Sequence, residues 1–502
     1  MRSFSRVFVM FSLITVLPLS GVVFADTSSL EQRLNDLEQQ VAILKRQIEN
    51  SKEETKTQVT TTPVVLANSK DGFSIKSPDG NYSLKIGGYT QIEAREFADN
   101  NKEELGEVSS ILARRVRLLI QGTVARDFDY YIQPDFGYNN TYSSISTYSP
   151  TSALLTAATP TAYGVALQDA WIDYRYNPDF IIKAGKMKTP FDLENLQDSR
   201  FTNFVELGLT GNLSPQRDVG VQVGGNLYFD WITYAAGLFD GAADKETGYG
   251  GYSSVANGDT DSKSGTGRIF ATPFKNTSIE PLRGLGIGYA VSYGKQKGSD
   301  LPTYISPGQA PVFGYYNTTN VVSAAGPQLR TEPQAYYYYK SLGILGERVD
   351  DHESLQYFTT AAPFSASSPG VIRDKVDNRA FSVEGSYVLT GEDASYSGVV
   401  PRHDFEPSSG HWGAVELVGR YGELKLDPTI FTKNFSNLNT SISKENAWAT
   451  GINWYLNRNA KVSFAFEQTK FDRGAYVAGG NSGNNGNRKT ENLFTTMLQL
   501  SI

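Results

Sequence analysis

The sequence contains no cysteine among its 502 residues. This excludes a disulfide scaffold and any cysteine-ligated zinc or iron–sulfur site. Histidine is also scarce: there are three, and no two have the spacing of a metal site on one element. The sequence therefore predicts neither a metal nor any other cofactor. The net charge of -7 argues against a nucleic-acid partner, which would select clustered lysine and arginine.

Long apolar runs are missing from the interior of the chain, which excludes a membrane protein built from several helices. One apolar segment lies at the start, where Arg2 and Arg6 precede the run from Val7 to Leu19. With the cleavage-type residues that end at Ala25, this pattern predicts a secretory signal peptide over residues 1–25 and hence export. A retained membrane anchor is the alternative, although the run is short for a hydrocarbon core of ~30 Å.

A short heptad pattern follows the signal peptide. It predicts a coiled-coil oligomerisation segment over residues 26–50, because such a short helix needs partners to bury its apolar stripe. The alternative is that this helix packs on the rest of the same chain. The residue types at the seam favour a two-stranded coiled coil. Residues 51–71, rich in Thr and Lys, are predicted to form a flexible linker. The seam residues are spaced 4, 3, 4, 3 and 4 apart: Leu30, Leu34, Leu37, Val41, Leu44 and Ile48.

From residue 72 to residue 502 the apolar residues recur with a period of two, as in the segment from Ala170 to Tyr176. Such alternation is typical of strands with one apolar and one polar face. Tight links and long polar loops alternate between the strands; only segment 390–410 is too long for its side. We place sixteen strands, starting near residues 82, 111, 128, 166, 180, 218, 231, 266, 285, 332, 342, 377, 411, 444, 460 and 489.

The alternation of short and long connections between an even number of strands predicts an all-β fold, a transmembrane antiparallel β-barrel of about 16 strands. The short N-terminal coiled-coil helix precedes this barrel. A soluble sandwich or propeller is the alternative, but it gives no reason for alternating loop lengths. The phasing places apolar residues such as Leu417 and Tyr421 towards lipid, and Glu416 and Arg420 towards a polar lumen. The last strand alternates to Ile502 and is expected to pair with the first and close the barrel.

Six segments carry a family resemblance: 71–76, 114–118, 183–191, 334–339, 387–392 and 412–417. Together they resemble the phosphate-selective porin O and P family of bacterial outer membranes, although the final Ile502 departs from the family's terminal Phe. The resemblance implies a homotrimer in the outer membrane of a Gram-negative-type bacterium, whose third long loop, here residues 189–217, folds into the lumen. We favour the trimer over two strands, since a large barrel interface outweighs six seam residues.

Basic residues are the candidates for binding an anion in the pore. The positions that match the family's paired arginines are Arg114 and Arg115; alternation points Arg115 and Arg117 into the lumen and places Arg114 near the membrane rim. Pairing of these arginines with acids in the wall is the alternative. Counting the lumen faces gives eight basic and seven acidic side chains, so selectivity would depend on local clustering. The further candidates are Lys85, Lys183, Lys186, Lys188, Arg200 and Arg420.

The sequence thus predicts a non-enzymatic porin, a water-filled channel for passive diffusion of small anionic solutes such as phosphate. Its expected partners are outer-membrane lipid, small anions and further copies of the chain. An outer-membrane lipase would need a serine and a histidine on the barrel wall, but the histidines fall in or beside loops. Two alternatives stay open: a weakly selective general porin, and a structural outer-membrane tether or adhesin. For the selective porin we expect replacement of both Arg115 and Arg117 by Ala to abolish the anion preference.

Overall fold

The computed structural model describes residues 35, 37–49, 63–68, 72–98, 109–137, 165–228, 230–241, 262–298, 301–315, 321–359, 370–474 and 487–502. The predicted signal peptide, Leu30, Leu34 and most of the predicted linker lie outside these residues. The chain divides into two compact units, residues 1–62 and residues 63–502.

In the first unit, residues 37–49 are helical, as the heptad spacing predicts. Leu37, Val41, Leu44 and Ile48 are each more than half exposed, so the seam is not buried within the described chain. Its burial against other copies of the chain stays a prediction. None of the described helices has both the length and the hydropathy that a membrane-crossing helix needs.

We expect deletion of residues 26–60 to leave a folded, conducting protein whose oligomer dissociates at a lower temperature and a lower detergent concentration. The seam lies outside the unit that contains the strands, so its loss removes only contacts between copies. Heating the purified oligomer in detergent and following its size on native gels would measure this. Loss of folding after the deletion would instead make the segment part of the fold.

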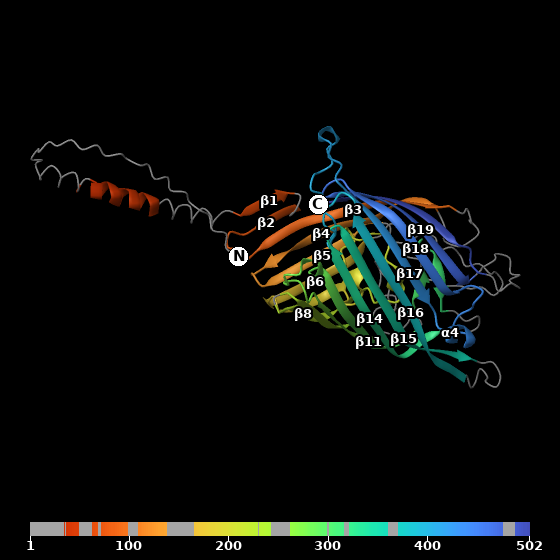
Figure 1. Ribbon diagram of the computed structural model, residues 1–502. Helices are drawn as coiled ribbons and strands as arrows, with labels where there is room; N and C mark the ends of the chain where they lie inside the picture. The colour runs from red at the N-terminus through yellow and green to blue at the C-terminus, as the bar shows by residue number, and fades with distance from the viewer. Residues whose placement is uncertain are drawn as a thin grey trace, which may run out of the picture. The chain divides into compact units, whose positions relative to one another are not determined.

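The second unit is an antiparallel barrel of sixteen strands, which wrap round a common lumen (Figure 1). Their number and their starts confirm the sequence prediction, within a few residues except at β14 and β16. The strands are β3 (Ser83–Phe97), β4 (Ser110–Val124), β5 (Phe128–Asp135), β6 (Ala166–Asn177), β7 (Phe180–Lys188), β8 (Arg217–Leu227), β9 (Ile232–Phe239), β10 (Lys263–Ala271), β11 (Leu285–Gly298), β14 (Ser323–Tyr339), β15 (Leu342–Thr359), β16 (Gly370–Val388), β17 (Ala414–Lys425), β18 (Ile442–Tyr455), β19 (Ala460–Arg473) and β20 (Glu491–Ser501).

Strand β20 pairs with β3, from Leu493 opposite Phe97 to Ser501 opposite Tyr89. This pairing confirms the predicted closure and leaves β3 and β20 with partners on both sides. Two further strands, β1 (Val64–Asn68) and β2 (Gly72–Lys76), extend the same sheet, with β2 pairing to the start of β3. The linker prediction is therefore wrong for residues 64–68, because the apolar run Val64-Val65-Leu66 pairs with β2.

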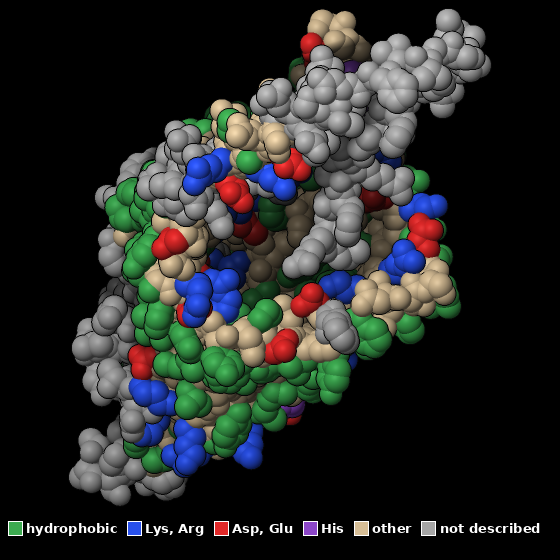
Figure 2. Space-filling view, turned by 90° about the vertical axis from the view of Figure 1, so that its left-hand side faces the viewer, with side chains coloured by type: hydrophobic (Ala, Val, Ile, Leu, Met, Phe, Trp, Pro, Cys, Tyr) green, Lys and Arg blue, Asp and Glu red, His purple; other side chains and the backbone are tan. Residues whose placement is uncertain are grey.

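The barrel is apolar outside and polar inside. On β17, Glu416 and Arg420 are buried, whereas Leu417 and Tyr421 are exposed. Trp448 and Ile452 on β18 lie in register with Tyr421 and Leu417, and both are exposed. Figure 2 shows hydrophobic side chains over the outer wall and charged side chains around the hollow end. This is the pattern of a barrel whose outer face meets lipid.

Short connections lie at one end of the barrel, as at residues 125–127, 178–179 and 340–341. The long connections lie at the other end, as predicted from the loop lengths. Strands β14 and β16 begin earlier than predicted, because their additional residues pair with β15 beyond the apolar band. The segment between β16 and β17, residues 389–413, is the longest connection on the short side, and residues 272–284 between β10 and β11 are also long for that side.

Candidate pore constriction

The connection between β7 and β8, residues 189–216, folds into the lumen and reaches several walls. The Leu193 amide donates to Glu347 Oε2 on β15 at 3.0 Å. The Ser199 carbonyl accepts from Gln91 Nε2 on β3 at 3.0 Å. The Asn203 carbonyl accepts from Asn453 Nδ2 on β18 at 3.1 Å. These bonds confirm the inward-folded third loop that the family resemblance implies, and we name residues 189–216 the constriction loop.

Short helical turns give the constriction loop its shape. Asp192 caps helix α2 (Leu193–Leu196), since its Oδ1 accepts from the Asn195 amide at 2.6 Å. A second turn, η1 (Leu209–Asn212), is joined to α2 by the Gly208 amide, which donates to Glu194 Oε2 at 2.8 Å. Burial raises the pKa of Asp192; burial and the nearby Glu384 carboxylate raise the pKa of Glu194 well above its usual value.

A β-bulge on β4 sets the direction of the paired arginines. Gln91 lies opposite Arg115 and Ile92 opposite Ala113, so Arg114 is the extra residue. A bulge puts neighbouring side chains on one face, and both Arg114 and Arg115 bind the constriction loop. The prediction that Arg114 lies near the membrane rim is therefore wrong, because strict alternation fails at the bulge.

Glu206 of the constriction loop is the shared partner of three arginines. Its carboxylate lies 2.7 Å from Arg95 Nη2, 2.5 Å from Arg114 Nε and 3.6 Å from Arg115 Nη2. Burial alone would raise the pKa of Glu206, but the three guanidinium groups outweigh it and lower the pKa to about 2. Arg114 and Arg115 thus hold the constriction loop against the wall.

We expect Glu206→Gln to destabilise the protein by about 3–5 kcal/mol, because it removes a buried carboxylate that three guanidinium groups share. Urea unfolding in lipid vesicles would measure this. The lowered pKa means that the contribution of Glu206 is fully present above pH ~4.5 and is lost only as the pH falls through about 2. The difference between wild type and variant should therefore stay constant from pH 8 to pH 5.

Glu423→Gln is the matched control for that prediction. Glu423 pairs with Lys444 at 3.0 Å, but both side chains are partly exposed, so its loss should cost less than about 1 kcal/mol. Equal effects of the two substitutions would contradict the anchoring role of Glu206.

Other predicted arginines are paired as well. Arg117 Nε lies 2.7 Å from Asp135 Oδ2, and its Nη1 donates to the Tyr89 hydroxyl at 2.8 Å. Arg420 is buried between Glu194, Glu384 and Glu467, at 3.2–3.4 Å. Arg200 pairs with Asp198 at 2.8 Å inside the constriction loop. These arginines, in the lumen wall and in the constriction loop, therefore form ion pairs with acidic side chains. Such pairing is the alternative to anion binding that the sequence left open.

A cavity of about 320 Å³, which we name the passage, lies between the constriction loop and the inward faces of β3 to β10. Pro190, Leu196, Asp198 and Ser199 border it on the loop side. Its walls carry five basic side chains against two carboxylates. The basic residues are Arg117, Lys183, Lys188, Arg217 and Arg268, and the acids are Asp169 and Asp198.

The five basic residues of the passage differ in their partners. Arg217 lies 3.2 Å from Asp169, and Lys188 Nζ donates to the carbonyls of Asn195 and Gln197. Lys183 Nζ lies 3.8 Å from the centroid of the Trp171 ring, and Arg268 Nε donates to Gln334 Oε1 at 2.8 Å. Among the residues that the structure describes, neither Lys183 nor Arg268 forms an ion pair.

Two predicted lysines lie away from the passage. Lys186 lies in register with Val219, whose exposed side chain faces outward. The Lys186 Nζ donates to the Leu167 carbonyl. Lys85 is half-buried opposite Gln121 and does not line the passage. Arg217 and Arg268 were not predicted from the sequence, although the alternation of Thr266, Arg268 and Phe270 would have placed Arg268 on an inward face.

The wall formed by β14 to β20, opposite the passage, is acidic, and the constriction loop covers part of it. Buried residues on β14 to β20 include nine carboxylates and three basic groups. Glu332 and Glu347 accept from the Leu193 amide of the constriction loop, and Glu384 accepts from Asn203 Nδ2 at 3.0 Å. The carboxylates are Glu332, Glu347, Asp351, Glu353, Glu384, Glu416, Glu445, Glu467 and Glu491; the basic groups are Arg330, Arg420 and Lys461.

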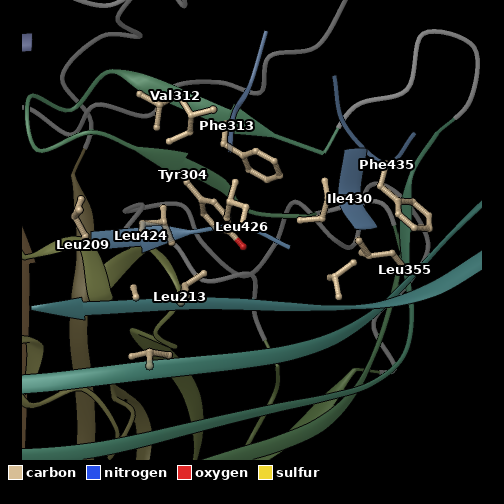
Figure 3. Packing of buried hydrophobic residues seen from close by; sticks show 14 of the residues in the cluster. Leu209, Leu213, Tyr304, Val312, Phe313, Leu355, Leu424, Leu426, Ile430 and Phe435 are labelled. Atoms are coloured by element: carbon tan, nitrogen blue, oxygen red, sulfur yellow. The ribbon is translucent and has the colours of Figure 1, made fainter. Parts of the chain in front are cut away.

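A hairpin between β11 and β14 covers more of this wall. Its strands, β12 (Thr303–Ile305) and β13 (Pro311–Gly314), carry Tyr304 and Phe313 into an apolar cluster with Leu426 and Ile430 (Figure 3). Glu491 on β20 binds the hairpin through Ser306 Oγ and the Gly308 amide, at 2.8 and 3.0 Å. The hairpin therefore fills lumen space beside the acidic wall.

The long segment 389–413 enters from the other end. The Tyr396 hydroxyl donates to the Leu193 carbonyl at 2.5 Å, and the Tyr396 carbonyl accepts from Gln197 Nε2 at 2.7 Å. Its ring stacks on Tyr336, with centroids 5.5 Å apart. The exception to the loop-length rule is thus a second inward-folded segment that supports the constriction loop.

Comparison with known proteins shows the family to which the chain belongs. The model of the family described as "Phosphate-selective porin O and P" matches residues 84–502. Porin O of Pseudomonas aeruginosa is 22% identical over 429 residues, which cover 82% of this chain and 88% of that protein. Among solved structures, the outer membrane channel DcaP of Acinetobacter baumannii aligns with a TM-score of 0.47 and 11% identity, over 85% of this chain and 99% of DcaP. An anion-selective porin from Comamonas acidovorans aligns with a TM-score of 0.46 and 9% identity, over 84% and 100%. By the family match, the chain belongs to the phosphate-selective porin O and P family of non-enzymatic outer-membrane channels.

Proposed function

We propose that this porin forms a water-filled channel for passive diffusion of small anions, phosphate among them. The observation that carries the proposal is the charge of the passage, which is lined by five basic side chains and two carboxylates. Fixed cations in a narrow pore attract anions and replace part of their hydration. Lys183 and Arg268 contribute most, because their charges are not balanced by an ion-paired carboxylate in the described structure.

The division of the lumen explains how a nearly neutral wall can still select anions. The constriction loop and the hairpin β12–β13 occupy the side where the carboxylates lie, so solute passes along the basic side. In this proposal Arg114, Arg115 and Arg420 position the constriction loop, while Arg117, Lys183, Lys188 and Arg268 set the potential of the passage. Porins of this kind assemble as trimers, and we propose a homotrimer joined further by the helix of residues 37–49.

The zero-current potential across a potassium chloride gradient tests the proposal. We expect chloride to be preferred over potassium, more strongly at 0.01 M than at 1 M salt, because screening lengths fall from ~30 Å to ~3 Å. Added phosphate should reduce the chloride current at millimolar concentration. A potential near zero at both ionic strengths would support a weakly selective general porin, and a preference for potassium would contradict the proposal.

The exposed heptad seam also fits a structural tether or adhesin that uses the helix to bind a partner. A tether needs no open passage. Single-channel conductance in a planar bilayer separates the two functions, since a tether alone gives no current steps.

A further inference from the structure

One side of the passage is aromatic. Tyr131 on β5 and Trp171 on β6 lie opposite each other, with ring centroids 5.3 Å apart and planes only 8° from parallel. Both rings line the passage, together with Tyr89, Met187 and Leu196. A bare inorganic anion gains little from such side chains, since it needs hydrogen-bond donors and positive charge. The aromatic side therefore offers a surface to which a bare inorganic anion does not bind.

The arrangement determines which part of the rings a solute meets. Strands β5 and β7 flank β6 on opposite sides, so Tyr131 covers one face of the Trp171 ring and Lys183 Nζ lies over the other, 3.8 Å from its centroid. The faces of Trp171 are thus occupied and its edge is left for the passage. Ring edges carry partial positive charge and pack well against the face of another aromatic ring.

Two basic groups line the same passage as these rings. Lys183 contacts Trp171 directly, and Arg268 lines the same passage of about 320 Å³. That volume is within the range of sites that enclose a small organic molecule. Such sites combine apolar and aromatic walls with a few polar groups that fix the orientation of the ligand.

We propose that the passage binds aromatic oxyanions, such as aryl phosphates and aromatic carboxylates, more tightly than the corresponding inorganic or aliphatic anions. The anionic group lies at Lys183 and Arg268, and the flat ring packs its face on the edges of Tyr131 and Trp171. This inference rests on the proposed anion-channel function and specifies its solute class.

Block of the chloride current in planar bilayers by phenyl phosphate and by inorganic phosphate, both at pH 8, tests the inference. We expect phenyl phosphate to reach half block at a roughly tenfold lower concentration, as one or two edge-to-face contacts would give. Benzoate and acetate form a second pair with a carboxylate in place of the phosphate, and phenol tests the ring without the charge. Benzoate should block better than acetate, and phenol should not block.

Trp171→Leu should bring the half-blocking concentration of phenyl phosphate to within about twofold of that of inorganic phosphate, and Trp171→Phe should retain most of the difference. Phe464→Leu is the matched control, because Phe464 is an exposed aromatic residue on the outer face, and it should change nothing. If Trp171→Leu does not fold, Tyr131→Leu serves in its place.

The outcomes separate the two proposals. An anion-preferring channel that phenyl phosphate blocks no better than phosphate, or whose block is unchanged in Trp171→Leu, overturns the inference and leaves the proposed function standing. A channel with no anion preference that neither anion blocks overturns both.

Discussion

Removal of Asp192 to Leu213 should raise the single-channel conductance severalfold. This stretch contains α2, η1 and the atoms that bridge the lumen from β3 to β15, β18 and β19. A barrel of sixteen strands without its constriction leaves a wide aqueous lumen. The hairpin β12–β13 and the segment 389–413 remain, so the gain stays below that of an empty barrel.

The anion preference should weaken in the same variant. The deletion uncovers basic groups on β3 and β4 as well as carboxylates on β14 to β16, and in the wider lumen more ions pass at a distance from the fixed charges, where salt screens them. Circular dichroism and resistance to trypsin would show that the barrel is intact. An unchanged conductance in a folded barrel would place the constriction loop outside the conducting path.

Much of the fold could be predicted from the sequence because a barrel in lipid imposes a simple pattern. Side chains along each strand must point alternately to lipid and to water. The polarity of a single residue, such as Leu417 or Glu416, therefore indicates the face on which it lies. Loop lengths then reveal the two ends. The boundaries of β14 and β16 were less predictable, because their extra residues lie beyond the apolar band, where alternation no longer reflects lipid contact.

The passage was harder to predict for two physical reasons. A bulge at Arg114 breaks the alternation locally, and nothing in a single sequence marks it. The partners of lumen charges also come from distant segments: Glu206 is 92 residues from Arg114, and Arg420 is 226 residues from Glu194. A count of wall charges cannot show which charges the constriction loop covers. Lys183 was therefore predicted only as one of several pore lysines, and Arg268 was not predicted.

Replacement of Lys183 and Arg268 together by Met should abolish or invert the anion preference with little change in conductance. Met keeps most of the length of both side chains but removes two of the five positive charges of the passage, and three basic residues then face two carboxylates. Of those three, Arg117 and Arg217 are ion-paired and Lys188 is bound to carbonyls. The zero-current potential at two ionic strengths would measure the change, which should be larger at low salt.

Arg175→Met is the matched control, because Arg175 is paired with Asp129 at 2.7 Å and does not line the passage; the potential should be nearly unchanged. Strand alternation in the sequence predicts the decisive role for Arg115 and Arg117 instead, so the variant with both replaced by Ala must be measured beside it. In that variant Glu206 keeps Arg95 and Arg114 as partners, while Asp135 loses Arg117. If the charges of Lys183 and Arg268 dominate, the Met variant loses the preference and the Ala variant retains part of it. Loss in the Ala variant with the preference intact in the Met variant would assign selectivity to Arg115 and Arg117, because Lys183 and Arg268 would then have been shown not to control it.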